Sequence, residues 1–90
     1  MNKAEFVGNV AEAAGLSKAD ASSAVDAMVK VITQALNSGE AVTMVGFGTF
    51  EVRGRAARQG RNPKTGDAIQ INASNNPAFK AGKALKDAVN

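Results

Sequence analysis

The sequence predicts an α+β protein, with two helices followed by antiparallel strands and a short final helix. Three observations lead to this class. Apolar residues recur at helical spacing over residues 1–39, they alternate at strand spacing between residues 41 and 72, and helical spacing returns after Gly82. No repeat, low-complexity tract or flexible linker interrupts this order, so residues 1–90 are expected to form one domain.

The first helix is predicted to start at Asn2 and to stop at Gly15. Asn2 is a suitable N-cap, and Glu5 stands three residues later, where its carboxylate can reach back to the cap. Gly15 can take the left-handed conformation that ends a helix, and the apolar Leu16 follows it, as is common at such ends.

The second helix is predicted to begin after Ser17 and to end at Gly39. Ser17 and Asp20 form a second capping signal, and an apolar stripe then continues to Leu36. Two helices joined by a short link predict a helical hairpin, or V, over residues 1–39.

The remaining elements follow from a change of period after Gly39. A turn containing a buried aromatic is expected between the first two strands, and an Asn-Asn-Pro sequence is expected to end the third strand. The expected segments are strands at 41–45, 49–53 and 68–72, the turn at 46–48, the break at 75–77 and a last helix at 82–89.

The composition predicts a thin hydrophobic core. Apolar residues make up 44% of the chain, but 18 of them are alanine. A domain of this size with little bulky apolar surface usually needs a disulfide, a metal or a partner subunit. The chain has no cysteine, which excludes disulfides, so we expect at least a dimer.

The residue types present argue against catalysis. The chain has no histidine and no cysteine, and its eight carboxylates lie in no recognisable catalytic or metal-binding motif. We therefore expect no enzymatic activity, no cofactor and no small-molecule substrate.

The sequence contains no apolar run long enough to cross a membrane and no secretory signal pattern. We therefore expect a soluble protein with no membrane partner that stays in the cytoplasm.

The segment from Arg53 to Gly66 stands out because it cannot join a core. Its five positive charges are accompanied by no negative one, and it lies between two predicted strands. Its Asn62-Pro63-Lys64-Thr65-Gly66 sequence has the chemistry of a turn. We predict a β-ribbon arm that reaches roughly 30 Å, at ~3.3 Å per residue, and whose arginines suit nucleic acid.

Pro63 at the expected tip has two interpretations. A proline in this position is most often a simple turn residue. A rigid apolar ring at a ribbon tip can also wedge between base pairs and kink a duplex, and a ribbon can instead lie in the major groove. The residues by themselves leave these alternatives open.

Two blocks of the sequence carry a family resemblance. "VGFGTFEVRGRAARQGRNPKTG" (residues 45–66) and "NPAFKAGKALKDAVN" (residues 76–90), together with the opening "MNKAEFV", resemble the bacterial histone-like HU/IHF family, and most of all its HU type. The resemblance covers the whole chain. It implies an intertwined homodimer in which two helical V's form the base and two arms hold DNA in the minor groove.

The resemblance also implies roles for individual residues. It implies that Pro63 is the intercalating wedge and that three phenylalanines form the aromatic core of the dimer. The implied DNA-binding residues are Arg53, Arg55, Arg58, Arg61, Asn62, Pro63, Lys64, Lys80, Lys83, Lys86 and Lys3, and the implied dimer-core residues are Phe47, Phe50 and Phe79. It further implies three parts: a helical dimerisation part (1–39), the sheet and arm (40–78, arm about 53–75) and a C-terminal helix (79–90).

The chain departs from the family pattern on the returning side of the arm. Asparagines stand at 72, 75 and 76, where relatives often carry lysine or an apolar residue, and Gly54 replaces a larger polar side chain. Fewer phosphate contacts on this strand predict weaker DNA binding or a shallower salt dependence than that of a lysine-rich relative.

The expected function is that of an architectural protein of the bacterial nucleoid. It would bind duplex DNA with little sequence preference, favour bent, nicked or otherwise deformable DNA, and bend or compact it. One alternative is an IHF-type subunit that bends selected sequences. Less favoured alternatives are a small RNA-binding protein and a module whose arm grips an acidic protein.

Overall fold

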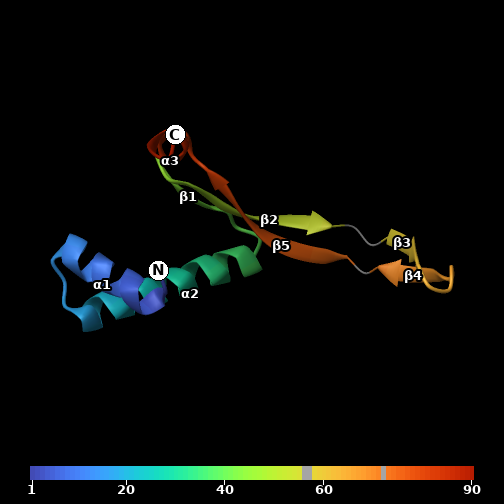
Figure 1. Cartoon of the computed structure of the whole chain (residues 1–90), viewed down its shortest axis with the longest axis horizontal. Helices are drawn as coiled ribbons and strands as arrows, with labels where there is room; N and C mark the ends of the chain where they lie inside the picture. Colours follow the sequence, from blue (N-terminus) through green and yellow to red (C-terminus); the bar gives the residue numbers. More distant parts are fainter. Residues whose placement is uncertain (56–57, 72) are drawn as a thin grey trace. The chain divides into compact units, whose positions relative to one another are not determined.

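The computed structural model describes residues 1–55, 58–71 and 73–90, and for Arg55, Arg58, Gln70 and Ile71 it describes the backbone. The chain divides into two compact units, Met1–Gln34 and Ala35–Asn90. The elements, drawn in Figure 1, are α1 (Lys3–Ala14), α2 (Lys18–Asn37), β1 (Val42–Met44), β2 (Gly48–Arg55), β3 (Arg58–Arg61), β4 (Ala68–Ile71), β5 (Ser74–Ala81) and α3 (Lys83–Ala88). The predicted α+β class is confirmed.

The predicted ends of α1 are confirmed. The side-chain oxygen of Asn2 accepts a hydrogen bond from the backbone N–H of Glu5 at 2.9 Å, as an N-cap should. Gly15 has φ of 69°, and the N–H of Leu16 donates to the carbonyl of Ala11 at 2.9 Å. This is the Schellman arrangement, which satisfies carbonyls that the end of a helix would otherwise leave unpaired.

The ends of α2 are built in the same way. The hydroxyl of Ser17 accepts from the N–H of Asp20 at 3.1 Å at the start. At the end, Gly39 has φ of 81°, and the N–H of Glu40 donates to the carbonyl of Ala35 at 2.9 Å. Short-range sequence signals therefore determine where both helices start and stop.

The first unit has a small core between α1 and the first turns of α2. Val7 and Ala11 of α1 pack with Ala21 and Val25 of α2, and Ala21 is completely buried. No bulky side chain is fully buried in the described part of the chain. This agrees with the thin core that the alanine-rich composition predicts.

Gly8, inside α1, is expected to weaken the helix. A Cβ built at Gly8 meets nothing within 4 Å. We therefore expect Gly8→Ala to raise the free energy of unfolding by about 0.5–1 kcal/mol, because alanine loses less backbone freedom in a helix. Thermal unfolding at a fixed protomer concentration measures this change. An unchanged or lower midpoint would mean that position 8 packs against something other than solvent.

The second unit contains a three-stranded antiparallel sheet in the order β1-β2-β5. The register pairs Phe50 with Val42 on one side and with Phe79 on the other. The expected break at 75–77 is wrong, because β5 runs through these residues and Pro77 pairs with Val52. β5 is an edge strand, and an edge tolerates a proline whose missing N–H faces away from the neighbouring strand.

A second, two-stranded sheet is formed by β3 and β4, with Arg61 paired with Ala68 and Arg58 paired with Ile71. Figure 1 shows this hairpin beyond the far ends of β2 and β5, so the four strands follow one another as a ribbon. The predicted arm is therefore present. Asn72, at the expected end of the third strand, lies outside the described residues.

Several predicted boundaries shift. The first strand is shorter than expected, at Val42–Met44, and the second is longer, at Gly48–Arg55. The last helix starts only at Lys83, and residues 79–81 belong to β5, so the expected helical segment 79–90 is wrong at its start. Pairing with β2 keeps these residues extended, which local propensity does not reveal.

Candidate nucleic-acid interface

The three-stranded sheet has two chemically different faces. Side chains alternate along a strand, and residues that are paired across strands share a face. The register therefore defines an apolar face, made of Val42, Met44, Phe50, Val52, Pro77 and Phe79. It also defines a polar face, made of Thr43, Thr49, Glu51, Arg53, Asn76, Ala78 and Lys80.

Two of the predicted DNA-binding residues share the polar face. Lys80 pairs with Thr49, and Arg53 pairs with Asn76 four residues further along the ribbon. Both cations are exposed. Arg55 continues the same strand and pairs with Ser74. The sheet therefore presents cations to solvent on one side, as phosphate binding requires.

The tip of the arm is a tightly hydrogen-bonded turn. The N–H of Asn62 donates to the carbonyl of Asp67 at 2.8 Å, and the N–H of Gly66 donates to the carbonyl of Asn62 at 2.7 Å. The side-chain oxygen of Asn62 accepts from the N–H of Lys64 at 2.9 Å. Gly66 has φ of 75°, which explains the glycine. Asn62 thus stabilises the turn that exposes Pro63.

Pro63 and Lys64 are exposed on this turn, and Arg61 is exposed at the end of β3 just before it. An exposed proline ring on a fixed turn is available to an apolar partner such as the gap between two base pairs. The side chains of Arg55 and Arg58, two further predicted contacts, lie outside the described residues.

The remaining predicted lysines of the second half lie on α3. Lys83 and Lys86 are both exposed. The helix is held to the turn before β2, because the N–H of Gly82 donates to the carbonyl of Phe47 at 2.8 Å. A Cβ at Gly82 would approach that carbonyl to 3.2 Å, so this contact favours glycine. Within the second unit, α3 therefore carries its lysines from a fixed starting point.

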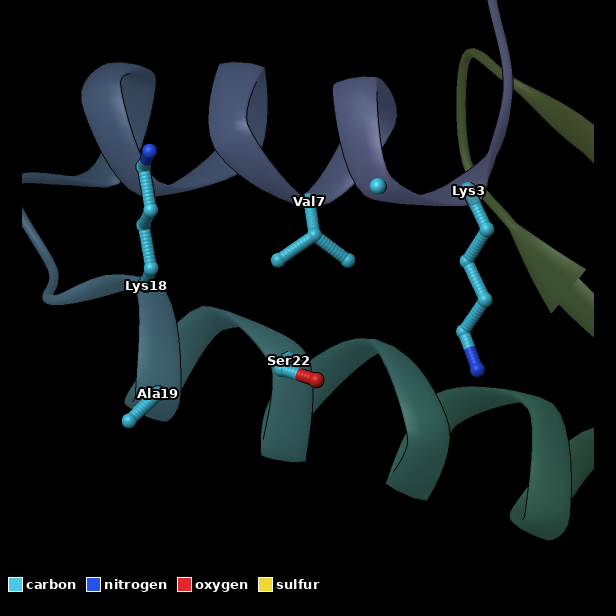
Figure 2. A pocket seen from close by; sticks show the side chains of 6 residues that line it. Lys3, Val7, Lys18, Ala19 and Ser22 are labelled. Carbon is cyan, nitrogen blue, oxygen red and sulfur yellow. The ribbon is translucent and has the colours of Figure 1, made fainter.

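Lys3 belongs to a different part of the chain from the other predicted contacts. Its ammonium lies 2.6 Å from a carboxylate oxygen of Asp26 in α2. The two helices line an open pocket formed by Lys3, Ala4, Val7, Lys18, Ala19 and Ser22, and Figure 2 shows Lys3 reaching from α1 towards α2. Both partners of the ion pair are well exposed, so its free energy is small. A phosphate would have to share Lys3 with Asp26.

The three predicted dimer-core phenylalanines form one cluster. The ring of Phe79 lies 5.2 Å from that of Phe47 and 4.8 Å from that of Phe50, centroid to centroid. The expectation that the turn aromatic Phe47 is buried is wrong for the single chain, in which Phe47 is 45% exposed and Phe79 40%. The side chains of the second unit therefore cover these two rings only in part.

Sequence reasoning missed two partners of the predicted cations. Arg53 is bound by Glu51, two residues earlier on the same strand, and Lys3 is bound by Asp26. Alternation in a strand puts residues i and i+2 on one face, so the first pair was open to prediction. The second depends on how α1 packs on α2.

In the described ranges, no three carboxylate, histidine or cysteine side chains gather as metal ligands. Among the same residues, no helix is both long and apolar enough to cross a bilayer.

The family is shown by comparison with known sequences. The family model described as bacterial DNA-binding protein matches residues 1–90. The chain belongs to this family, the HU/IHF proteins. A DNA-binding protein HU of Xylella fastidiosa is 65% identical over 89 residues, covering 99% of this chain and 95% of its own. The HU protein of Geobacillus stearothermophilus is 62% identical and covers 99% of both chains.

Solved HU structures share the fold. A cocrystal structure of Anabaena HU with DNA matches with a TM-score of 0.87 and 48% identity, over 99% of this chain and 97% of that one. HU from Thermotoga maritima matches with a TM-score of 0.70 and 37% identity over the whole of both chains. The HU fold is thus reproduced from the helical hairpin to the arm.

Proposed function

We propose that this protein is a nucleoid-associated architectural protein that binds duplex DNA with little sequence preference and bends or compacts it. The observation that carries the proposal is the arm and sheet of the second unit. Exposed cations follow one another from Lys80 and Arg53 on the polar face to Arg61 and Lys64 at the tip. Such a row of cations neutralises successive phosphates and releases counterions, which drives binding to any sequence.

The arm supplies the bending. Pro63 is exposed on a turn that is held closed by hydrogen bonds of Asn62 with Lys64, Gly66 and Asp67. Inserted between two base pairs in the minor groove, its ring unstacks them and kinks the duplex. DNA that is already nicked or bent costs less to deform, so preference follows deformability and not base identity.

The DNA-binding residues in this proposal act in three groups. The arm residues contact groove and phosphates, the lysines of β5 and α3 lie beneath the duplex, and Lys3 makes a flanking contact that competes with Asp26. The groups are Arg53, Arg55, Arg58, Arg61, Asn62, Pro63 and Lys64 for the arm, Lys80, Lys83 and Lys86 for the underside, and Lys3 for the flank.

We propose that the working form is a homodimer. Phe47 and Phe79 are about half exposed, and Val45, in the same turn as Phe47, is fully exposed. In α2, Val29 and Val31 are also largely exposed. Apolar surface of this extent on so small a chain is typical of a subunit interface. The helical part and the apolar face provide the interface, and the polar face and the arm are left for DNA.

The proposal needs neither a cofactor nor an enzymatic reaction. The relatives that the chain matches carry the names of DNA-binding proteins. Action on the nucleoid places the protein in the bacterial cytoplasm.

A binding isotherm on nicked and intact duplexes of one sequence, repeated at several salt concentrations, tests the function. We expect tighter binding to the nicked duplex and a steep salt dependence on both. Equal binding to both would contradict the bending mechanism. Strong competition by a single defined site would favour the IHF-type alternative, and tighter binding to A-form RNA than to DNA would favour the RNA-binding one.

A further inference from the structure

An acidic residue stands in the middle of the polar face. Glu51 shares this face with Arg53 and Lys80, and it is the one carboxylate among the residues that define the face. Its side chain is 33% exposed, compared with 64% for Arg53. A negative charge at the place that the proposed function gives to phosphates requires a physical explanation.

Glu51 is bound to Arg53 by two hydrogen bonds. The Nε and Nη2 groups of Arg53 donate to the same oxygen, Oε1 of Glu51, at 3.1 and 3.0 Å. A guanidinium has five N–H donors in a fixed fork. Two of the three groups that carry them are therefore directed at the carboxylate, and the positive charge of Arg53 is balanced within the protein.

The pair follows from the alternation of side chains along β2, because both partners belong to this strand. Residues 51 and 53 lie on one face, about 7 Å apart along β2 at ~3.3 Å per residue, which the two long side chains span easily. A phosphate that binds Arg53 must then lie well within one Debye length of Glu51, about 10 Å at 0.1 M salt. The carboxylate and the phosphate compete for one guanidinium and repel each other.

We propose that Glu51 attenuates DNA binding by holding Arg53 in an internal ion pair that a backbone phosphate must share or displace. This inference rests on the proposed function, because it needs the polar face to meet DNA. It assigns Glu51 a role in setting affinity, with no contact to bases. A lowered affinity keeps a protein that binds everywhere along DNA in rapid exchange.

A purely orienting role for Glu51 makes the opposite prediction. If Glu51 served to aim Arg53 at a phosphate, removing its side chain would weaken binding. Glutamine at position 51 keeps an oxygen that accepts from Arg53 but carries no charge, and alanine keeps neither. The two substitutions therefore separate the charge of Glu51 from its hydrogen bonds.

The experiment compares Glu51→Gln and Glu51→Ala with the wild-type protein on one intact duplex, at several salt concentrations around 0.1 M. We expect both variants to bind about three- to tenfold more tightly at low salt, with the difference fading as salt screens the charge. The salt dependence should steepen by up to about one unit per protomer, because Arg53 becomes free to replace a counterion. Thermal unfolding checks that the variants fold.

Glu12→Gln, in α1, is the matched control, because it makes the same change in net charge outside the second unit. We expect it to tighten binding by less than about twofold. An equal effect of Glu12→Gln would overturn the inference in favour of net charge, and weaker binding by Glu51→Ala would overturn it in favour of orientation. If the wild-type protein bound no DNA at all, the proposed function itself would fail. If the wild-type protein bound DNA and the Glu51→Gln variant bound it with the same affinity, only the inference about Glu51 would fail.

Discussion

Pro63→Ala is expected to reduce the bend angle of bound DNA strongly, while affinity for an intact duplex falls by less than about tenfold. The substitution removes the exposed ring at the tip but no charge, so the phosphate contacts that dominate affinity remain. Unstacking two neighbouring base pairs costs about a few kcal/mol per base step. Without the inserted proline ring nothing compensates for this cost, so the kink is reduced. Fluorescence energy transfer between the duplex ends measures the bend.

Two controls accompany this measurement. Pro77→Ala removes the other proline, which lies in β5 opposite Val52, and it should leave the bend angle unchanged. Lys64→Ala removes a charge from the same turn and should lower affinity and the salt dependence more than the bend. A bend angle unaffected by Pro63→Ala would contradict the wedge and leave Pro63 as a turn residue.

Gly48→Ala is expected to destabilise the protein severely. A Cβ at Gly48 would lie 2.5 Å from the carbonyl oxygen of Lys80 and 2.5 Å from the ring of Phe79. The carbonyl belongs to the strand paired with β2, so it cannot move without disturbing that pairing. We expect a loss of about 2–4 kcal/mol, as for other overpacked or strained sites. This corresponds to a fall in melting temperature of at least about 8 °C for a chain of this size.

Calorimetry or circular dichroism at one protomer concentration measures this loss, since the stability of a dimer depends on concentration. Gly8→Ala is the matched control, with the same substitution in open space and the opposite expected sign. A Gly48→Ala protein as stable as the wild type would mean that β2 and β5 are further apart at this point.

Much of the fold follows from short-range signals in the sequence. Asn2, Gly15, Ser17 and Gly39 mark the helix ends, and each acts as its residue type predicts. The turn at Asn62–Gly66 is likewise predictable, because Asn, Pro and Gly favour that turn through their own backbone geometry. These signals act over a few residues, so a linear sequence contains them completely.

The predictions that failed concern long-range contacts. The sequence pattern at Asn75-Asn76-Pro77 indicates a break, yet pairing with β2 keeps the chain extended. Phe47 has the character of a core residue but is 45% exposed in the single chain, and its burial by a partner subunit stays a prediction. Propensity reports on neighbours in sequence, and burial depends on neighbours in space.

The same distinction between short-range signals and long-range contacts applies to the candidate site. The sequence by itself determined the run of unaccompanied cations, the turn with its proline and the scarcity of bulky apolar residues that predicts a partner subunit, because charge, turn chemistry and apolar content are properties of composition and order. Only the tertiary structure decided that Arg53 and Lys80 share one face, that Asp26 holds Lys3 and that Phe79 closes over Gly48. Strand register and helix packing bring together residues that are far apart in the chain, and small shifts in either would separate them.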